Sequence, residues 1–233
     1  MAESRDENDG SAIDEMDRPR TIHRGSFDPV RIADGGTASG GTLLGITTGD
    51  GVLMAADTRT SRGTVTSSED VQKMSQVHPT AVLGSTGDLG ELQSFVRTIR
   101  AEADRYETEH DEPMDSATLS TVTARELREH AVSDITVLLG GVDDGSHVFT
   151  IGRDEGVVEE TYAAVGSGRE AAYGILDAEV PQSPSLSEAR LIAGRAIESA
   201  IERDVQTGVG VHVAEISQRG VDIDRYDSVD EFR

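Results

Sequence analysis

The chain has 233 residues, a formal net charge of −23 and no cysteine. The missing cysteines exclude a disulfide framework and thiolate chemistry. The acidic balance argues against nucleic acid or an anionic membrane as the main partner, because both bind clustered Lys and Arg. No apolar run approaches the roughly 18 residues of a membrane span, and the N-terminus lacks the pattern of a signal peptide. We therefore expect a cytoplasmic protein, and carboxylates spread along the whole chain indicate a salt-adapted cytosol.

Three regions differ in composition. Residues 1–41 are polar, acidic and rich in Gly and Ser, which predicts a flexible leader that could be removed. Residues 42–220 carry the apolar patterns of a folded domain. Residues 221–233 are again acidic and are expected to form a C-terminal tail.

The first expected elements are a hairpin, a strand and two helices. Residues 42–57 hold two apolar runs joined at Asp50-Gly51, a strong signal for a hairpin turn. Residues 80–87 predict a strand that ends in a Gly-rich turn. Apolar residues then recur at helical spacing over 89–103, and a second helix is expected over 116–130, with Asp115 as its N-cap.

The second half repeats this grouping of strands and helices. Strands are expected over 134–143, 146–154, 160–168 and 209–217, and helices over 169–180 and from Ser185 to about Arg203. Ser185 and Glu188 fit a capping box. Because strands group with strands and helices with helices, we expect an α+β fold. Two helix pairs would cover two antiparallel sheets in a four-layer αββα sandwich.

Lys73 is the only lysine of the chain, beside twenty arginines. A lone lysine is most often a solvated surface charge. Arginine serves that purpose equally well, but it cannot replace lysine where a compact ammonium with a movable pKa is needed, as beside a nucleophile. In a chain that avoids lysine elsewhere, Lys73 is therefore a functional candidate.

Several motifs follow one another along the chain. Asp57 ends the second apolar run of LGITTGDGVLMAADTRTS, and Lys73 follows it. Further motifs are GSTGD, LLGGVDD with HVFTIGRDEG, AVGSGREAAYGIL and ERDVQTG. In this order they resemble the proteasome β-type family, and the resemblance covers nearly everything from Gly41 to about Ile216. It implies the fold of the N-terminal-nucleophile hydrolases and a threonine-type endopeptidase whose leader is cut off to expose the nucleophile.

The resemblance also implies roles for individual residues. Lys73 would polarise the threonine hydroxyl and Asp57 would hold Lys73, while the freed α-amine serves as general base near neutral pH. Ser167, Asp204 and Thr207 would support that amine and a water; Thr207 stands where a serine is usual. The Gly87 backbone N–H would stabilise the oxyanion.

The blander interpretations of these residues are structural. Asp57 could cap a turn, Ser167 could be the N-cap of the following helix, and Asp204 could be a surface acid at a helix end. The six histidines show no metal-ligand spacing, and neither a metal nor a cofactor is expected.

The resemblance implies partners as well. The chain would pack with other β subunits and with α subunits in stacked seven-membered rings. A regulatory ATPase would act indirectly and polypeptides would be the substrates. A simpler bacterial two-ring relative, which lacks α partners, is a weaker possibility.

The start of the expected mature chain departs from the family. It reads GGTLLG, and an ungapped match places Gly41, which has no hydroxyl, at the nucleophile position. The chain would then be a non-catalytic, structural β-type subunit. Alternatively Thr42 is the nucleophile and the Gly41–Thr42 bond is cleaved. Strand alternation opposes this, because Thr42 shares a face with Leu44 unless a bulge or a frayed end re-aims it. The retained Lys73 favours Thr42, which we take as the candidate nucleophile.

Overall fold

The computed structural model describes residues 20–21, 40–62, 65–87, 89–129, 135–153 and 156–233. The expected leader, residues 1–41, lies almost wholly outside the described residues. Among the helices described, none is both long and apolar enough to span a bilayer.

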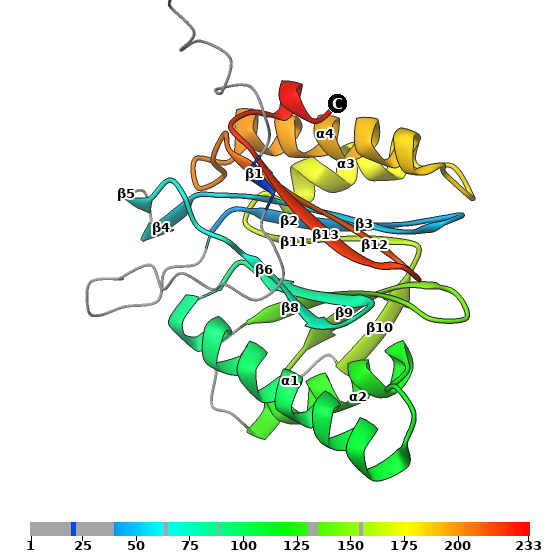
Figure 1. Ribbon diagram of the computed structural model, residues 1–233. Coiled ribbons are helices and arrows are strands. Elements are labelled where there is room, and N and C mark those ends of the chain that lie inside the picture. Colours follow the sequence, from blue (N-terminus) through cyan, green and yellow to red (C-terminus); the bar gives the residue numbers. More distant parts are fainter. Residues whose placement is uncertain (1–19, 22–39, 63–64, 88, 130–134, 154–155) are drawn as a thin grey trace, which may run out of the picture.

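The fold has four layers, with two sheets between two pairs of helices (Figure 1). The first sheet has six strands in the order β1 (Arg20–Thr21), β13 (Gly220–Tyr226), β12 (Val211–Ser217), β3 (Gly51–Asp57), β2 (Thr42–Thr48) and β11 (Tyr162–Gly166). The second has five, in the order β10 (Gly156–Glu160), β9 (Ser146–Gly152), β8 (Thr136–Val142), β7 (Ala81–Ser85) and β6 (Met74–His78). A small ribbon joins β4 (Thr60–Arg62) to β5 (Val65–Ser68).

Each helix pair covers the outer face of one sheet. Helices α3 (Arg169–Glu179) and α4 (Leu186–Arg203) pack on the six-stranded sheet. Helices α1 (Leu89–His110) and α2 (Ser116–Glu129) pack on the five-stranded sheet. All the strand pairs described are antiparallel. The expected αββα sandwich is therefore confirmed.

Strand alternation divides the buried apolar residues into three layers. Along β2, Leu44 and Ile46 face α3 and α4, whereas Leu43 faces the second sheet. Along β3, Leu53 and Ala55 face the helices, and Val52, Met54 and Ala56 face the other sheet. A strand with apolar residues on both faces is buried on both sides, which explains why these segments read as continuous apolar runs.

The local signals that were read from the sequence hold at the helix ends. Asp115 Oδ1 accepts a hydrogen bond of 2.6 Å from Thr118 N, and Ser185 and Glu188 form the capping box at the start of α4. The hairpin turn lies at Gly49–Asp50, one residue earlier than expected, because Thr48 pairs with Gly51. Gly51 lies inside β3, where a Cβ would come within 2.1 Å of the Ile216 carbonyl oxygen.

The C-terminal residues belong to the sandwich. The expected acidic tail, residues 221–233, instead contributes nearly all of β13, which pairs with β12 along its whole length. It then forms the short 3-10 helix η1 (Val229–Glu231). Val229 and Phe232 pack in the core between the first sheet and helices α3 and α4. The sequence pattern did not indicate this strand because its apolar residues alternate with acidic ones, of which Asp222 is exposed and Asp224 is half-buried.

Phe232→Ala tests this assignment. Phe232 is 2% exposed, so removing its ring leaves a cavity, and we expect a loss of about 3 kcal/mol in the free energy of unfolding. Asp230→Ala is the control in the same short helix, since its side chain is 87% exposed, and it should change stability by less than about 0.5 kcal/mol. Chemical denaturation of both variants gives the comparison. Equal, small effects would show that the C-terminus does not contribute to the core.

Candidate active site

Gly41 lies at the centre of the expected active site, at the start of β2. A Cβ built on Gly41 would be 2.1 Å from Lys73 Nζ and 2.3 Å from Asp57 Oδ1. A side chain at position 41 would therefore project directly onto the lysine and the aspartate. Gly41 adopts a φ of 108°, which favours glycine because it has no Cβ. The structure thus brings Asp57 and Lys73 together around a residue without a side chain.

Asp57 and Lys73 form a buried ion pair. Lys73 Nζ donates to Asp57 Oδ1 at 2.6 Å, and the two side chains are 1% and 0% exposed. Lys73 Nζ also donates to the Gly40 carbonyl oxygen at 3.1 Å. Burial lowers the pKa of Lys73, and the Asp57 carboxylate acts in the opposite direction. Among the residues that the structure describes, no hydroxyl group is bonded to the lysine.

Thr42 points away from this pair. Its side chain lies on the face of Leu44, as the strand alternation predicts, and β2 pairs with β11 in regular register up to Thr42, without a bulge. Thr42 Oγ1 lies 2.9 Å from Thr207 Oγ1, and Thr42 is 0% exposed. Only its backbone reaches the ion pair, since Thr42 N donates to Asp57 Oδ1 at 2.7 Å.

Ser167, Asp204 and Thr207 form a second cluster, centred on a carboxylate. Ser167 Oγ and Thr207 Oγ1 both donate to Asp204 Oδ2, at 2.6 and 2.7 Å. Since Thr207 uses its only hydroxyl proton for Asp204, it accepts from Thr42 at their contact. Ser167 Oγ in turn accepts from Gly41 N at 2.9 Å. The structure therefore brings these three side chains together, with Ser167 on the backbone of Gly41 and Thr207 on the hydroxyl of Thr42.

The structural interpretations of the same residues have different outcomes. Ser167 does not cap α3, whose N-cap is Gly168 without a side-chain hydrogen bond. Asp57 does hold a turn, because its Oδ2 accepts from Arg59 N at 3.0 Å. Gly87 N donates to Ser85 Oγ at 3.2 Å, so in this structure its N–H is already engaged.

His212 is a buried group near the ion pair, and no sequence pattern singled it out. It lies on β12, 3% exposed, and its Nδ1 lacks a hydrogen-bond partner among the described residues. Burial and the charges of Arg225 and Lys73 lower its pKa to about 4, while Asp70 opposes this shift. Only its place in an alternating strand, between Val211 and Val213, could have indicated burial.

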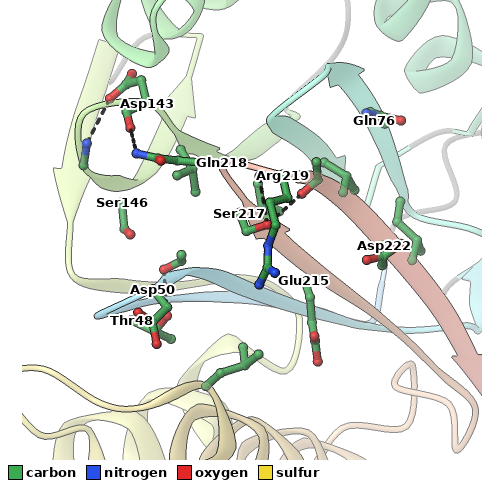
Figure 2. A pocket seen from close by; sticks show the side chains of 18 of the residues that line it. Thr48, Asp50, Gln76, Asp143, Ser146, Glu215, Ser217, Gln218, Arg219 and Asp222 are labelled. Atoms are coloured by element: carbon green, nitrogen blue, oxygen red, sulfur yellow. Dashed lines mark hydrogen bonds between the residues drawn. The ribbon is translucent and has the colours of Figure 1, made fainter.

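A wide cavity lies at the other end of the strands. It has a volume of about 1350 Å³ and opens between the tips of the β2–β3, β8–β9 and β12–β13 hairpins. In Figure 2 the Arg219 side chain projects from the β12–β13 turn between Asp50 and Glu215. Thr48 and Gly51 line this cavity, whereas Gly41 and Asp57 lie at the opposite ends of β2 and β3. It is therefore separate from the Gly41 site.

No metal is indicated at either place. Among the described residues, no group of three or more His, Asp or Glu side chains is arranged to hold a metal ion. The chemistry available near Gly41 is that of an ammonium, two carboxylates and three hydroxyls. These are groups that can activate and orient a nucleophile, but the position that faces the ammonium carries no hydroxyl.

A four-layer αββα sandwich, with a lysine and an aspartate beside the first residues of the inner strand β2, is the arrangement of the N-terminal-nucleophile hydrolase folds. A sequence profile described as "Proteasome subunit" matches residues 37–216. The chain belongs to the proteasome subunit family, and the similar proteins below are of its β type.

Three haloarchaeal proteasome β subunits are similar to this chain in sequence. The proteasome subunit beta of Halorubrum lacusprofundi is 42% identical over 85% of this chain and 82% of its own length. The proteasome subunit beta 2 of Haloterrigena turkmenica is 44% identical over 82% of each chain. The proteasome subunit beta of Haloferax volcanii is 39% identical over 84% of this chain and 81% of its own length. They agree with the salt-adapted composition, and the expected β-type family is confirmed.

His212 provides a test of the electrostatics beside the site. Its pKa is about 4 in the folded chain and near 6.5 when unfolded. The unfolded state therefore takes up the proton first as pH falls. Above pH 6.5 His212 is neutral in both states and leaves the free energy of unfolding at its full value. Between pH 6.5 and about pH 4 this free energy falls progressively, by about 3 kcal/mol in total.

The measurement is chemical denaturation of wild type and His212→Gln at constant salt between pH 4 and 8. The free energy of unfolding of wild type minus that of His212→Gln should decrease as pH falls through this window. All other titratable groups contribute equally to both proteins and cancel in the difference. His110→Gln, at the exposed end of α1, is the control and should leave the wild-type profile unchanged. A pH-independent difference for His212→Gln would contradict the assigned pKa.

Proposed function

We propose that this chain is a non-catalytic β-type subunit of a cytoplasmic 20S proteasome core particle. It fills a position in a β ring, beside other β subunits and against α subunits, in stacked seven-membered rings. Peptide hydrolysis in such a particle depends on β subunits that carry a nucleophile, and a regulatory ATPase supplies unfolded polypeptides to them. The family membership supports the assembly, and the geometry at Gly41 supports the lack of catalysis.

The observation that carries the proposal is the direction of the missing side chain. Position 41 is the one from which a Cβ would point to Lys73 and Asp57, at 2.1 and 2.3 Å. A nucleophile must lie within hydrogen-bond reach of the groups that activate it. Glycine offers no hydroxyl there, so the activating groups have nothing to activate.

The position of Thr42 also supports this proposal. Its hydroxyl is buried at 0% exposure and donates to Thr207. A Cβ on Gly168 would lie only 2.2 Å from that oxygen, so the backbone closes over it. A hydroxyl enclosed in this way cannot meet a peptide carbonyl unless the start of β2 is rebuilt.

A second candidate keeps Thr42 as the nucleophile. Its hydroxyl donates to Thr207, which donates to Asp204, so a proton on Thr42 has a hydrogen-bonded path to a carboxylate. Cleavage of the Gly41–Thr42 bond would free the Thr42 amine beside Asp57. Lys73 takes no part in this path, so its retention would find no explanation in the chemistry of this candidate.

Particles assembled from this chain and its ring partners distinguish the two candidates. We expect Thr42→Val and wild-type particles to hydrolyse unfolded polypeptides and short peptides at equal rates, because Thr42 does no chemistry. Intact mass of the chain in the particle should show an uncleaved Gly41–Thr42 bond. A mature chain that begins at Thr42, together with loss of hydrolysis in Thr42→Val, would establish the second candidate instead.

The structural role has a test of its own. Co-expression with the α subunit and a nucleophile-bearing β subunit should give ring-sized particles that contain this chain, as measured by native mass. Asp230→Ala, an exposed substitution, should enter particles as wild type does, whereas Phe232→Ala should enter less because its core is weakened. Particles that form without this chain in the β ring would contradict the proposed role.

A further inference from the structure

Lys73 makes contacts that a merely vestigial lysine does not need. Its ammonium is 1% exposed and has two acceptors, Asp57 Oδ1 at 2.6 Å and the Gly40 carbonyl oxygen at 3.1 Å. An ammonium in a protein interior costs several kcal/mol unless close acceptors compensate for the lost water. The Gly40 carbonyl is therefore part of what keeps this charge stable, and it lies immediately upstream of the sandwich.

Asp57 connects this contact to the rest of the fold. Besides the lysine, its carboxylate accepts from Thr42 N at 2.7 Å, Gly208 N at 2.7 Å and Arg59 N at 3.0 Å. These donors come from the start of β2, the loop after α4 and the turn after β3. One buried charge pair therefore joins four chain segments, counting the segment before β6 that holds Lys73.

Gly41 is required by the same arrangement. The lysine ammonium and the Asp57 carboxylate occupy the space that a Cβ at position 41 would take. The positive φ of Gly41 directs the Gly40 carbonyl towards the lysine. The groups that would activate a nucleophile thus hold the backbone on both sides of the residue that would carry it.

We propose that Gly40, Asp57 and Lys73 form a junction lock, an internal contact that closes the former active site and fixes the Gly40 backbone to the sandwich. The lock gives the single lysine a function in a chain without a nucleophile. It rests on the proposed function, because it exists only while the residues before Gly41 remain attached. Lysine is needed because the guanidinium of an arginine is planar and larger. It cannot fit the same enclosed space and still donate hydrogen bonds to both Asp57 and the Gly40 carbonyl oxygen.

The test uses the full-length chain and three substitutions, namely Lys73→Met, Lys73→Arg and Gly41→Ala. Hydrogen exchange is followed at the three amides that donate to Asp57, with Leu53 and Val213 as core references. We expect exchange at the three amides to rise on the order of tenfold or more relative to the references in each variant, because hydrogen bonds to a charged group are lost or weakened. The melting temperature should fall, on the order of 10 °C for Lys73→Met.

Two control variants match the changes in charge and in backbone. Arg203→Met removes one positive charge from a side chain that is 62% exposed. Gly174→Ala adds a Cβ where no atom lies within 4 Å. Neither should alter the exchange of the three amides relative to the core.

The outcomes separate this proposal from the proposed function. The lock would be overturned if, in both Lys73→Met and Gly41→Ala, the three amides exchanged at the same rate relative to Leu53 and Val213 as in wild type. This holds whatever the particles hydrolyse. If Lys73→Met does not fold, Gly41→Ala decides, because it keeps both charges. Hydrolysis that depends on Thr42 would overturn the non-catalytic role, and it is measured on assembled particles rather than on the free chain.

Discussion

The ion pair between Lys73 and Asp57 is the interaction on which the site depends. It is almost completely buried, so neither charge can be removed without leaving the other unpaired in the interior, which is far more costly than the pair itself. The carboxylate also accepts hydrogen bonds from three backbone N–H groups. The start of β2, the end of β3 and the loop after α4 therefore take their positions from one side chain.

Strand alternation decides which residue meets that pair. Successive side chains of a strand point to opposite faces. A side chain at position 41 or one at position 42 can therefore reach the Lys73–Asp57 ion pair, but not both. Regular pairing with β11 up to Thr42 leaves no bulge that could change the choice. Thr42 consequently faces α3 and α4 and joins the hydroxyl cluster around Asp204. The geometry of a strand, more than the chemistry of threonine, determines what the hydroxyl can do.

Most of the fold could be predicted from the sequence because its signals are local. The four helices follow from apolar spacing and caps, and the β2–β3 hairpin follows from two apolar runs around a turn. Strands β1, β4, β5, β6, β10 and β13 were not foreseen. Val157 and Val158 of β10 are exposed at a sheet edge, and β13 alternates acidic and apolar residues, so neither has the continuous apolar run of a buried strand. Their place depends on pairing with distant neighbours, which a local pattern does not encode.

Part of the site could likewise be predicted from the sequence, and part could not. The resemblance to the proteasome β-type family implied the grouping of Asp57 with Lys73, and of Ser167 with Asp204 and Thr207. Strand alternation already opposed a meeting of Thr42 and Lys73. The contact with the Gly40 carbonyl could not be predicted, because it depends on the positive φ of Gly41. The burial of His212 likewise depends on two sheets packing together.

The single lysine is explained by the same constraint. The chain replaces lysine by arginine wherever a charge faces solvent, as at Arg105 and Arg203, whose side chains are 54% and 62% exposed. A buried position is different, since an ammonium is compact and can direct its protons separately to a carboxylate and a carbonyl, whereas a guanidinium needs a planar, wider space. At the surface either cation fits, so the overall preference for arginine decides the residue. In the interior the shape of the enclosed space decides it. Among the described residues, Lys73 is the one lysine or arginine side chain that is fully enclosed, and packing is therefore what keeps a lysine at this position.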